Sequence, residues 1–416
     1  MWQTRYSMVA MCAVATFICY IDRVNISVAI IPMADEFGWD RATQGLIMSS
    51  FFAGYLLTQI AGGWLADRFG GKAVLGMGVL FWSAFTIITP PAAFAGLTFL
   101  LASRVGMGLG EAVTFPSIYS LYARWLPALE RTRAIAFTFS AVPLGTVFAL
   151  ILTPIIVLNL GWEWAFYLFG VMGIIWYLFW LQYAKTNPKD HPKITAAELD
   201  LIESNQMDEK PGEPPSIRKM LGSISVWAII VSHFCSNWGG YVLLSWMPTY
   251  ISEGLGVDFA AVGMFTMIPA MASFLFMNVA GWVTDRLISS GMNVTFVRKL
   301  MQTIGFGGGA MVLAVVGYVQ SVPMAIALMS FGNMVGAFAL GGWGTNHMDI
   351  APRHAGTLMG LSNTAGTVPG IIGVYVSGLI LHATNSWVLV FQTAAAVYIF
   401  GLIFFLVFGS AEKEFD

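Results

Sequence analysis

The chain has 416 residues, of which 57% are hydrophobic and only 10% are charged, and its formal net charge is −2. Soluble domains carry about 25% charged residues, so the composition excludes an ordinary soluble protein, and the near-zero net charge indicates no nucleic-acid partner. Five uncharged stretches are long enough for one or two membrane helices each, since one span needs about 20 residues; they are 73–103, 134–162, 220–252, 300–348 and 354–411.

Twelve membrane-spanning helices fit the sequence, and we therefore predict an all-α polytopic membrane protein. The spans are expected at 7–33, 43–66, 72–90, 96–123, 133–158, 163–184, 225–252, 260–284, 297–319, 323–348, 355–381 and 386–409. Cys12, Cys19 and Cys235 all fall inside predicted spans, where they are interpreted as small apolar core residues, with no disulfide framework or metal site. No small-residue cleavage site follows the first apolar run, so we expect it to remain as a helix.

The distribution of positive charge predicts the orientation. An even number of spans puts both termini on one side of the membrane. If that side is the cytoplasm, 17 of the 20 lysines and arginines face it, with Arg41 outside and Arg23 and Arg104 within the membrane. This bias predicts cytoplasmic termini. Short termini and the absence of long lumenal loops favour a bacterial inner membrane.

A polar segment in the middle of the chain, Lys185–Lys219, separates two sets of six spans. Thr195 and Glu198 form a capping-box pattern that predicts a short surface helix, and this helix is followed by Pro211, Pro214 and Pro215. We expect an N-terminal six-helix bundle over 1–184, a cytoplasmic linker over 185–222 and a C-terminal six-helix bundle over 223–416.

The two sets of spans carry a repeated motif. Gly63-Trp-Leu-Ala-Asp67-Arg68 follows the second span, and Gly281-Trp-Val-Thr-Asp285-Arg286 follows the eighth, 218 residues later. Two six-helix halves related by a repeat are typical of transporters that work by alternating access. We predict gating roles for Asp67, Arg68, Asp285 and Arg286, because an aspartate can cap a helix and pair with a neighbouring base in one conformation only. Ordinary interfacial charge that fixes the topology is the alternative.

Four fully charged side chains fall at membrane depth, all in the first half: Asp22, Arg23, Arg104 and Glu111. Charges at this depth usually face a bundle interior or a water-filled path. Arg104 and Glu111 lie seven residues apart, close to two helical turns, so their side chains are predicted to project from nearly the same face. The three glycines between them leave that face unscreened. A static ion pair that locks two helices is the alternative interpretation.

Longer motifs resemble a known family. The stretch Gly63-x-x-x-Asp67-Arg68-x-Gly70-x-Lys72 is similar to the loop signature of the major facilitator superfamily. Three further stretches resemble the anion:cation symporter branch of this superfamily: Tyr20-Ile-Asp22-Arg23-Val-Asn25, residues 51–59 and Glu111-Ala-Val-Thr-Phe-Pro116. That branch includes bacterial sugar-acid transporters and carriers of the sialin, vesicular glutamate and phosphate type. The sialin side of that branch is resembled by Asn346-His347-Met-Asp349-Ile-Ala-Pro352 and the stretch 360–370.

The resemblance implies a fold of two pseudo-symmetric six-helix bundles and proton coupling at Asp22 and Glu111. A carboxyl group that is buried but close to an arginine can titrate near neutral pH, which agrees with that role. Three positions differ from the patterns of particular branch members and narrow the range of predicted substrates. Ser236 stands where vesicular glutamate carriers have an arginine, Met48 where they have a histidine, and Val142 where sugar-acid transporters often have a glutamine.

A carboxylate substrate needs a fixed cation, and the planar guanidinium of arginine suits it. We favour Arg23 for this role, with Tyr55 as a hydrogen-bond donor beside it and Arg104 acting on Glu111 or Asp22; the reverse assignment of the two arginines stays open. Neutral polar groups of the second half are expected to bind the substrate body. The full predicted substrate-binding set is Arg23, Tyr55, Arg104, Tyr119, Asn237, Tyr241, Ser362 and Asn363.

The leading hypothesis is a monomeric, proton-coupled symporter of a small organic anion, such as a sugar acid or a sialic-acid-like molecule, in contact with membrane lipid. No enzyme activity, cofactor or metal site is predicted, and no phosphate-binding glycine loop is present. The alternatives are a sodium- or proton-coupled phosphate carrier and a membrane anion sensor that does not transport. His233 is expected at the membrane interface, and His347 and His354 in gating or structural contacts near a cytoplasmic turn.

Overall fold

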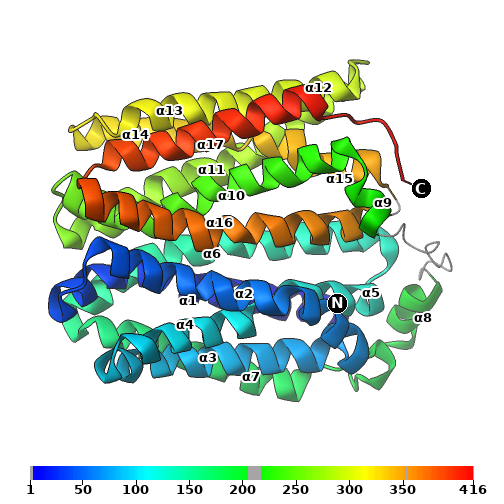
Figure 1. The fold of residues 1–416 in the computed structure, drawn as a ribbon. Coiled ribbons are helices and arrows are strands. Elements are labelled where there is room, and N and C mark those ends of the chain that lie inside the picture. Colours follow the sequence, from blue (N-terminus) through cyan, green and yellow to red (C-terminus); the bar gives the residue numbers. More distant parts are fainter. Residues whose placement is uncertain (1–2, 205–216, 353, 416) are drawn as a thin grey trace. The chain divides into compact units, whose positions relative to one another are not determined.

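The computed structural model describes residues 3–204, 217–352 and 354–415, and within these ranges the chain forms helices and no β-strand. Figure 1 shows long helices running alongside one another. The chain folds as two compact units, one made of Met1–Pro32 and Ser50–Lys210 and the other of Met33–Ser49 and Pro211–Asp416. The predicted all-α class is confirmed, whereas the predicted domain boundaries at 184 and 222 stay a prediction.

Each predicted span of the first half corresponds to helical structure. The helices are α1 (Thr4–Phe37), α2 (Arg41–Phe69), α3 (Gly71–Ala95), α4 (Leu97–Glu111), α5 (Thr114–Trp125), α6 (Ala128–Leu160) and α7 (Trp162–Tyr183). The predicted fourth span is divided into α4 and α5, so Glu111 is the last residue of α4 rather than a mid-helix position.

The second half also follows the predicted spans. Its helices are α9 (Ile217–Leu221), α10 (Ile224–Thr249), α11 (Phe259–Ser289), α12 (Val294–Gln302), α13 (Gly308–Val316), α14 (Val322–Gly336), α15 (Thr345–Ile350), α16 (Ala355–Thr384) and α17 (Trp387–Phe408). Three π-helical turns interrupt or follow these helices. Turn η2 (Tyr250–Gly254) follows α10, η3 (Thr303–Gly307) lies between α12 and α13, and η4 (Leu340–Gly344) precedes α15. Such turns are rare and often occur at functional sites.

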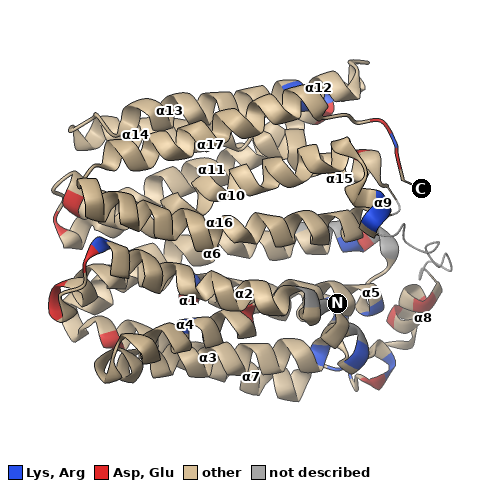
Figure 2. Ribbon diagram, in the orientation of Figure 1, with Lys and Arg blue, Asp and Glu red and all other residues tan. Residues whose placement is uncertain are grey.

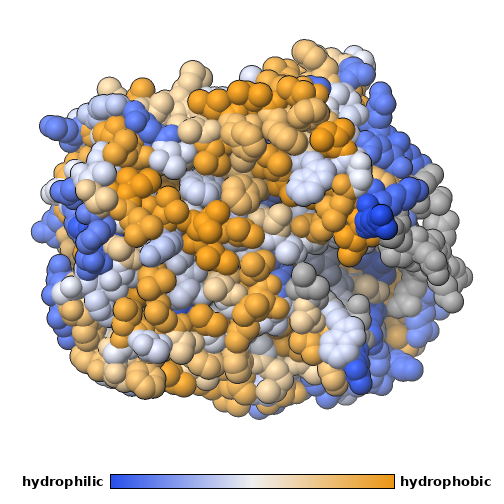
Figure 3. All heavy atoms as spheres, viewed as in Figure 1, coloured by the Kyte–Doolittle hydropathy of each residue, from blue (hydrophilic) through white to orange (hydrophobic). Residues whose placement is uncertain are grey.

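Among the described residues, nine helical segments are long and apolar enough to cross a membrane. Helices α2, α4 and α10 are not among them, and these three carry several of the polar residues predicted to act in transport. In the ribbon of Figure 2, most positions of Lys, Arg, Asp and Glu lie near the ends of the helices. The face drawn in Figure 3 is hydrophobic over the middle of the helices and hydrophilic toward their ends. This pattern fits helices that pass through lipid.

Glycines set the close packing of α4 against its neighbours. A methyl group at Gly108 would lie 2.0 Å from the carbonyl oxygen of Phe51 on α2, and one at Gly54 would lie 2.0 Å from that of Val105 on α4. A methyl group at Gly106 or Gly110 would instead meet α3. The glycines of α4 therefore allow two other helices to approach it, a stronger reason for their presence than an unscreened face.

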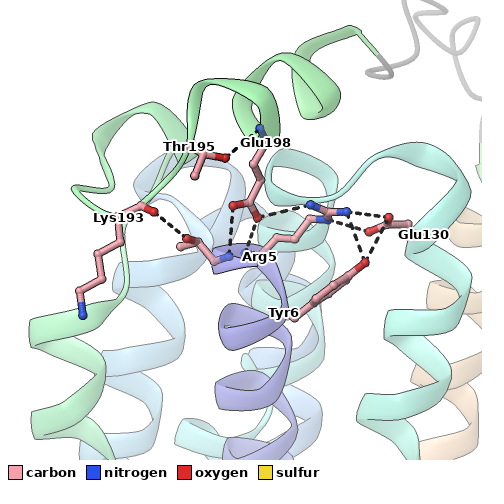
Figure 4. Close-up of polar contacts among 7 residues, drawn as sticks. Arg5, Tyr6, Glu130, Lys193, Thr195 and Glu198 are labelled. Carbon is pink, nitrogen blue, oxygen red and sulfur yellow. Dashed lines mark hydrogen bonds and ion pairs between the residues drawn. The ribbon is translucent and has the colours of Figure 1, made fainter. Parts of the chain in front are cut away.

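The predicted linker helix is confirmed as α8 (Ala196–Ser204). The backbone N–H of Glu198 donates to Thr195 Oγ1 at 3.2 Å, as the capping box predicts. Figure 4 shows the Glu198 carboxylate facing the start of α1, where it accepts hydrogen bonds from the backbone N–H groups of Thr4 and Arg5. The guanidinium of Arg5 also contacts Glu198 and pairs with Glu130 of α6 at 2.8 Å. The linker helix is thus fixed to α1 and α6, while the three prolines after it lie outside the described residues.

The turn between α1 and α2 packs within the second unit. Arg41 at the start of α2 forms an ion pair with Glu253 of η2, with Nη1 2.9 Å from Oε1. Asp40 lies 3.4 Å from His382 of α16, and a methyl group at Gly45 would lie 3.2 Å from the Cα of Gly378. These contacts explain why residues 33–49 belong to the second unit although they are early in the chain.

Candidate functional site

The centre of the first unit is an ion pair between α1 and α4. Arg23 donates to Glu111 Oε2 from Nη2 at 2.9 Å and from Nε at 3.1 Å. The thiol of Cys19, one helical turn before Arg23, donates to the same oxygen at 3.2 Å. Arg23 is 7% exposed and Glu111 is 0% exposed. Breaking such a buried pair on one side leaves an uncompensated charge, which costs about 3–5 kcal/mol.

Only one of the two Glu111 oxygens takes part in these contacts. Oε1 is buried and has no hydrogen-bond partner among the described residues. A carboxylate can accept hydrogen bonds on both oxygens, and its protonated form places an O–H on one of them. Oε1 is therefore an available position for a proton, whereas Oε2 is held by Arg23 and Cys19.

Aromatic rings surround the guanidinium of Arg23. Its central carbon lies 4.8 Å from the ring centroid of Tyr20, 5.0 Å from Phe51 and 4.9 Å from Tyr55. These distances fit cation–π contacts, which stabilise a cation that has lost its water. The sequence predicts Tyr55 as a hydrogen-bond donor beside Arg23, and in the structure the ring of Tyr55 contacts the guanidinium.

Asp22 is held apart from this ion pair. Its Oδ2 accepts a hydrogen bond from the indole N–H of Trp82 on α3 at 3.1 Å, and its Oδ1 is buried without a partner among the described residues. Asp22 and Arg23 are neighbours in sequence but contact different helices. The sequence left open whether Arg104 acts on Asp22 or on Glu111, and in the structure the hydrogen-bond donor to Asp22 is the indole of Trp82.

Arg104 is a buried cation of a different kind. It is 1% exposed, its Nη1 lies 3.0 Å from the sulfur of Met107, and its guanidinium lies 5.5 Å from the ring of Phe51. Its Nε has no hydrogen-bond partner, and no carboxylate of the described residues lies within ion-pair distance. A sulfur atom and a ring face are weak partners for a full charge. Arg104 can therefore accept an anionic partner.

The seven-residue spacing predicts only that Arg104 and Glu111 share a face of the helix, and it does not identify the partner of either residue. Arg104 and Glu111 lie on one helix, but Glu111 pairs with Arg23 of α1, and Arg104 contacts Met107. The shared ring of Phe51 lies beside both guanidinium groups. Tyr119 on α5 is 47% exposed and lies outside the contacts described here.

The predicted polar residues of the second unit fall into two places. Asn237 on α10 donates to the carbonyl oxygen of Gly366 at 2.8 Å and lines a cavity of about 240 Å³. Ser236, Ser273, Asn333 and Tyr398 also line this cavity. Tyr241 and Asn363 are half-buried. Ser362 is fully buried, where its hydroxyl contacts two imidazole rings, those of His233 and His347.

His233 departs from its expected interfacial place. It is buried on α10 and packs against Trp343, with ring centroids 4.3 Å apart. The sequence placed it near the start of a span, but α10 turns this position toward α16. The pairing of His233 with Ser362 across 129 residues leaves no spacing signal in the sequence.

The predicted gating residues form few described contacts. The side chain of Asp67 lies outside the described part of the chain, and the guanidinium of Arg68 lies 5.0 Å from the ring centroid of Trp64. Asp285 and Arg286 are exposed on α11. Their gating role stays a prediction.

A different ion pair joins helices at this end of the second unit, and sequence reasoning missed it. Arg298 of α12 donates to both oxygens of Asp349 on α15, at 2.7 and 3.0 Å, and to the carbonyl oxygen of Gly341 in η4 at 3.0 Å. This bidentate geometry is the strong form of an arginine–carboxylate contact. Asp349 belongs to a motif that the sequence singles out, but nothing in the sequence links it to Arg298.

Within the described residues no cluster of three or more histidine, cysteine, aspartate or glutamate side chains could hold a metal ion. Among the residues that the structure describes, the site consists of the paired guanidinium of Arg23, the guanidinium of Arg104 without a carboxylate partner, and two carboxyl groups that each have one oxygen without a hydrogen bond. Such a set can bind an anion and exchange protons.

The sequence model described as Major Facilitator Superfamily matches residues 12–374. The chain belongs to the major facilitator superfamily. Its curated relatives include the Ascorbate transporter, chloroplastic, of Arabidopsis thaliana, which is 44% identical over 100% of this chain and 77% of that protein. Sodium-dependent phosphate transport protein 1, chloroplastic, of the same plant is 43% identical over 99% of this chain and 80% of its own length. Sialin of Homo sapiens is 34% identical over 99% and 90%.

Solved structures of this superfamily share the fold. A bacterial homolog of the human lysosomal transporter Spinster, in an inward-facing and unoccupied conformation, matches with a TM-score of 0.77 at 17% identity, over 99% of this chain and 96% of that one. A D-xylose-proton symporter matches with a TM-score of 0.76 at 16% identity, over 98% and 99%. The twelve-helix fold of the superfamily is thereby confirmed, and this superfamily member is a transporter and not an enzyme.

The ion pair can be tested by its effect on stability. Arg23→Met and Glu111→Gln each leave one buried partner without its counterpart, so each is expected to lower the melting temperature of the purified protein in detergent. Arg23→Met/Glu111→Gln removes both charges and should lose less stability than the sum of the two single changes, by about 0.5–3 kcal/mol. Thermal unfolding monitored by fluorescence measures all three variants.

Arg218→Met and Glu203→Gln, at exposed positions outside the membrane helices, serve as matched controls and should have little effect. Strict additivity of the Arg23 and Glu111 changes would contradict an energetically coupled pair.

Proposed function

We propose that the protein is a proton-coupled symporter of a small organic anion that works by alternating access. The observation that carries this proposal is the presence of two buried arginines with different partners: Arg23 is neutralised by Glu111, and Arg104 has no carboxylate partner among the described residues. Relatives named as ascorbate transporter, phosphate transport protein and sialin support an anionic cargo.

Arg104 is assigned to the anionic group of the substrate. A guanidinium offers planar, paired N–H donors that match a carboxylate, and Nε of Arg104 has no acceptor among the described residues. Nε and Nη2 of Arg23 already donate hydrogen bonds to Glu111. The geometry therefore favours the reverse of the arrangement first preferred from the sequence, with Arg104 at the substrate and Arg23 at the coupling carboxylate.

Glu111 is assigned to proton coupling, with Asp22 as a second carboxyl group. Protonation of Glu111 neutralises the carboxylate and weakens its hold on Arg23, which frees α1 and α4 to move relative to one another. With Asp22 and Glu111 both ionised, the charges of these two carboxylates, Arg23 and Arg104 sum to zero. An anion bound at Arg104 then adds a net negative charge, and a proton on Glu111 offsets it. Proton and anion then move together, because either alone would leave an uncompensated charge in the membrane interior.

The remaining predicted substrate contacts are assigned to the neutral body of the substrate. Tyr55 and Tyr119 offer phenol groups in the first unit, and Asn237, Tyr241 and Asn363 offer amide or phenol groups in the second unit. The buried hydroxyl of Ser362 is already hydrogen-bonded to His233, His347 and Met359, so we do not assign it to the substrate. Among the assigned groups, Asn237 is the strongest, because it lines a cavity of about 240 Å³. Such neutral donors and acceptors suit a sugar acid or another hydroxylated carboxylate.

A phosphate carrier is the second candidate, favoured by the 43% identity to the sodium-dependent phosphate transport protein. A guanidinium binds phosphate as well as carboxylate. Uptake of labelled phosphate, ascorbate and sialic acid into proteoliposomes, driven by a sodium gradient or by a proton gradient, separates the two candidates. Counterflow of any of these solutes would exclude a non-transporting anion sensor.

For the membrane, we infer cytoplasmic termini from the charge bias and a monomer surrounded by lipid. The bacterial inner membrane expected from the short termini finds no support in the relatives, several of which are named as chloroplastic.

The coupling role is tested by Glu111→Gln, which removes the protonatable group and keeps its size. We expect this variant to lose uptake driven by an inward proton gradient while keeping exchange of labelled for unlabelled substrate, because exchange needs no net proton movement. Proteoliposome assays with an imposed pH gradient measure both activities. Glu203→Gln, on the linker helix, is the matched control and should behave as wild type. Accumulation by Glu111→Gln against a gradient would show that another group carries the proton.

The anion-binding role is tested by Arg104→Lys, which keeps the charge but loses the planar donor pair. We expect the KM for the transported anion to rise about tenfold or more, equal to about 1.4 kcal/mol of binding, with a smaller change in the maximal rate. Initial uptake rates over a range of substrate concentrations give both constants. Arg218→Lys is the matched control. An unchanged KM would assign the substrate to another residue.

A further inference from the structure

A cluster of three buried side chains joins α10, α15 and α16 in the second unit. The hydroxyl of Ser362 on α16 lies 2.8 Å from Nε2 of His347 on α15 and 3.1 Å from Nδ1 of His233 on α10. All three residues are buried. None of them belongs to the Arg23–Glu111 pair, which lies in the first unit.

Hydrogen-bond chemistry fixes one nitrogen of His347. Its Nδ1 lies 3.0 Å from the carbonyl oxygen of Gly344. A carbonyl oxygen can only accept, so Nδ1 carries a hydrogen in every protonation state that keeps this contact. The state of His347 is therefore decided at Nε2, the nitrogen that faces Ser362.

Ser362 has two acceptors for its single hydroxyl hydrogen. One is Nε2 of His347, and the other is the carbonyl oxygen of Met359, one turn earlier on α16, at 3.1 Å. When His347 is neutral, the hydroxyl donates to Nε2. When Nε2 carries a proton, it donates to Ser362 Oγ, and the hydroxyl donates to Met359 instead. Both nitrogens of His347 are hydrogen-bonded in either state.

His233 completes the cluster without competing for the same hydrogen. When the hydrogen of the neutral ring is on Nδ1, this nitrogen donates to the second lone pair of Ser362 Oγ, which leaves the hydroxyl hydrogen for His347 or Met359. The ring is held between Trp343, at 4.3 Å between centroids, and Gly366, where a methyl group would lie 2.9 Å from Nε2. Gly366 therefore leaves the room that the imidazole ring occupies.

The surroundings hold no carboxylate that pairs with either imidazole among the described residues. Asp349, two residues from His347, is paired with Arg298 of α12. Further ionisable groups occur on the elements packed around the cluster. They are Cys235 and Tyr241 of α10, His354 before α16, Tyr375 of α16, Tyr398 of α17 and Glu414 of the C-terminal segment. Buried polar atoms without a described partner also occur here, in Asn346, Ser232 and Trp343.

We propose that His347 is a second proton-binding site, in which Ser362 turns its hydroxyl between His347 and Met359 as the proton arrives and leaves. Protonation changes the bond between α15 and α16 from a neutral hydrogen bond to a charge-assisted one, which is stronger. This site goes beyond the coupling carboxylate of the first unit. Its use during transport rests on the proposed symport, whereas its titration does not.

The test is a titration of the full-length protein, labelled with ¹⁵N-histidine, in lipid nanodiscs. Nuclear magnetic resonance of the imidazole nitrogens is recorded from about pH 8 down to about pH 4, a range that brackets histidine titration. The five histidines are assigned with His→Gln variants. We expect Nε2 of His347 to change from the unprotonated to the protonated signal while Nδ1 stays protonated throughout. Nitrogen signals of His347 that do not change over this range would overturn the proposal.

Ser362→Ala and Ser362→Thr show whether the hydroxyl takes part. Alanine removes the hydroxyl oxygen that accepts a hydrogen bond from the protonated imidazole of His347, so the titration of His347 should move to lower pH by about half a unit or more. Threonine keeps a hydroxyl group, so the titration should stay near its wild-type position. Equal titration in all three proteins would overturn the relay role of Ser362. Because these readouts need no transport, failure of the Glu111→Gln uptake test would leave this result standing, and the reverse also holds.

Discussion

Taking a guanidinium and a carboxylate out of water is costly, and in the first unit that cost is offset by the contact between Arg23 and Glu111. The contact fixes α1 against α4, and Phe51 of α2 lies beside both Arg23 and Arg104. With Glu111 committed to Arg23, the charge of Arg104 stays without a carboxylate partner among the described residues. The arrangement therefore combines a carboxyl group that can take a proton with a cation that can take an anion.

The two units solve the problem of buried polar groups differently. The first unit uses full charges, and one of them, that of Arg104, has no carboxylate partner among the described residues. The second unit uses neutral groups: the amide of Asn237 beside a cavity, and the hydroxyl of Ser362 between two imidazoles. Arg298 of α12 and Asp349 of α15 are charged but are paired with each other.

Much of the fold follows from the sequence, because long uncharged stretches and their polar boundaries predict helices that cross a membrane. The four charged residues at membrane depth were also predictable, since charge at that depth is rare. Their pairing was not. The seven-residue spacing placed Arg104 and Glu111 on one face of a helix, but the partner of Glu111 is Arg23 of α1, which no spacing within one helix can indicate. The break after Glu111 and the burial of His233 likewise depend on packing between segments that are distant in sequence.

The central claim is that Glu111 gains and loses a proton as the anion binds. Infrared difference spectroscopy of the protein, recorded before and after addition of a transported anion, detects the C=O stretch of a protonated carboxyl group. The account predicts a carboxyl band that changes on binding in wild type and is missing from Glu111→Gln. The same band in Glu111→Gln, or no carboxyl band in a wild-type protein that binds the anion, would contradict it.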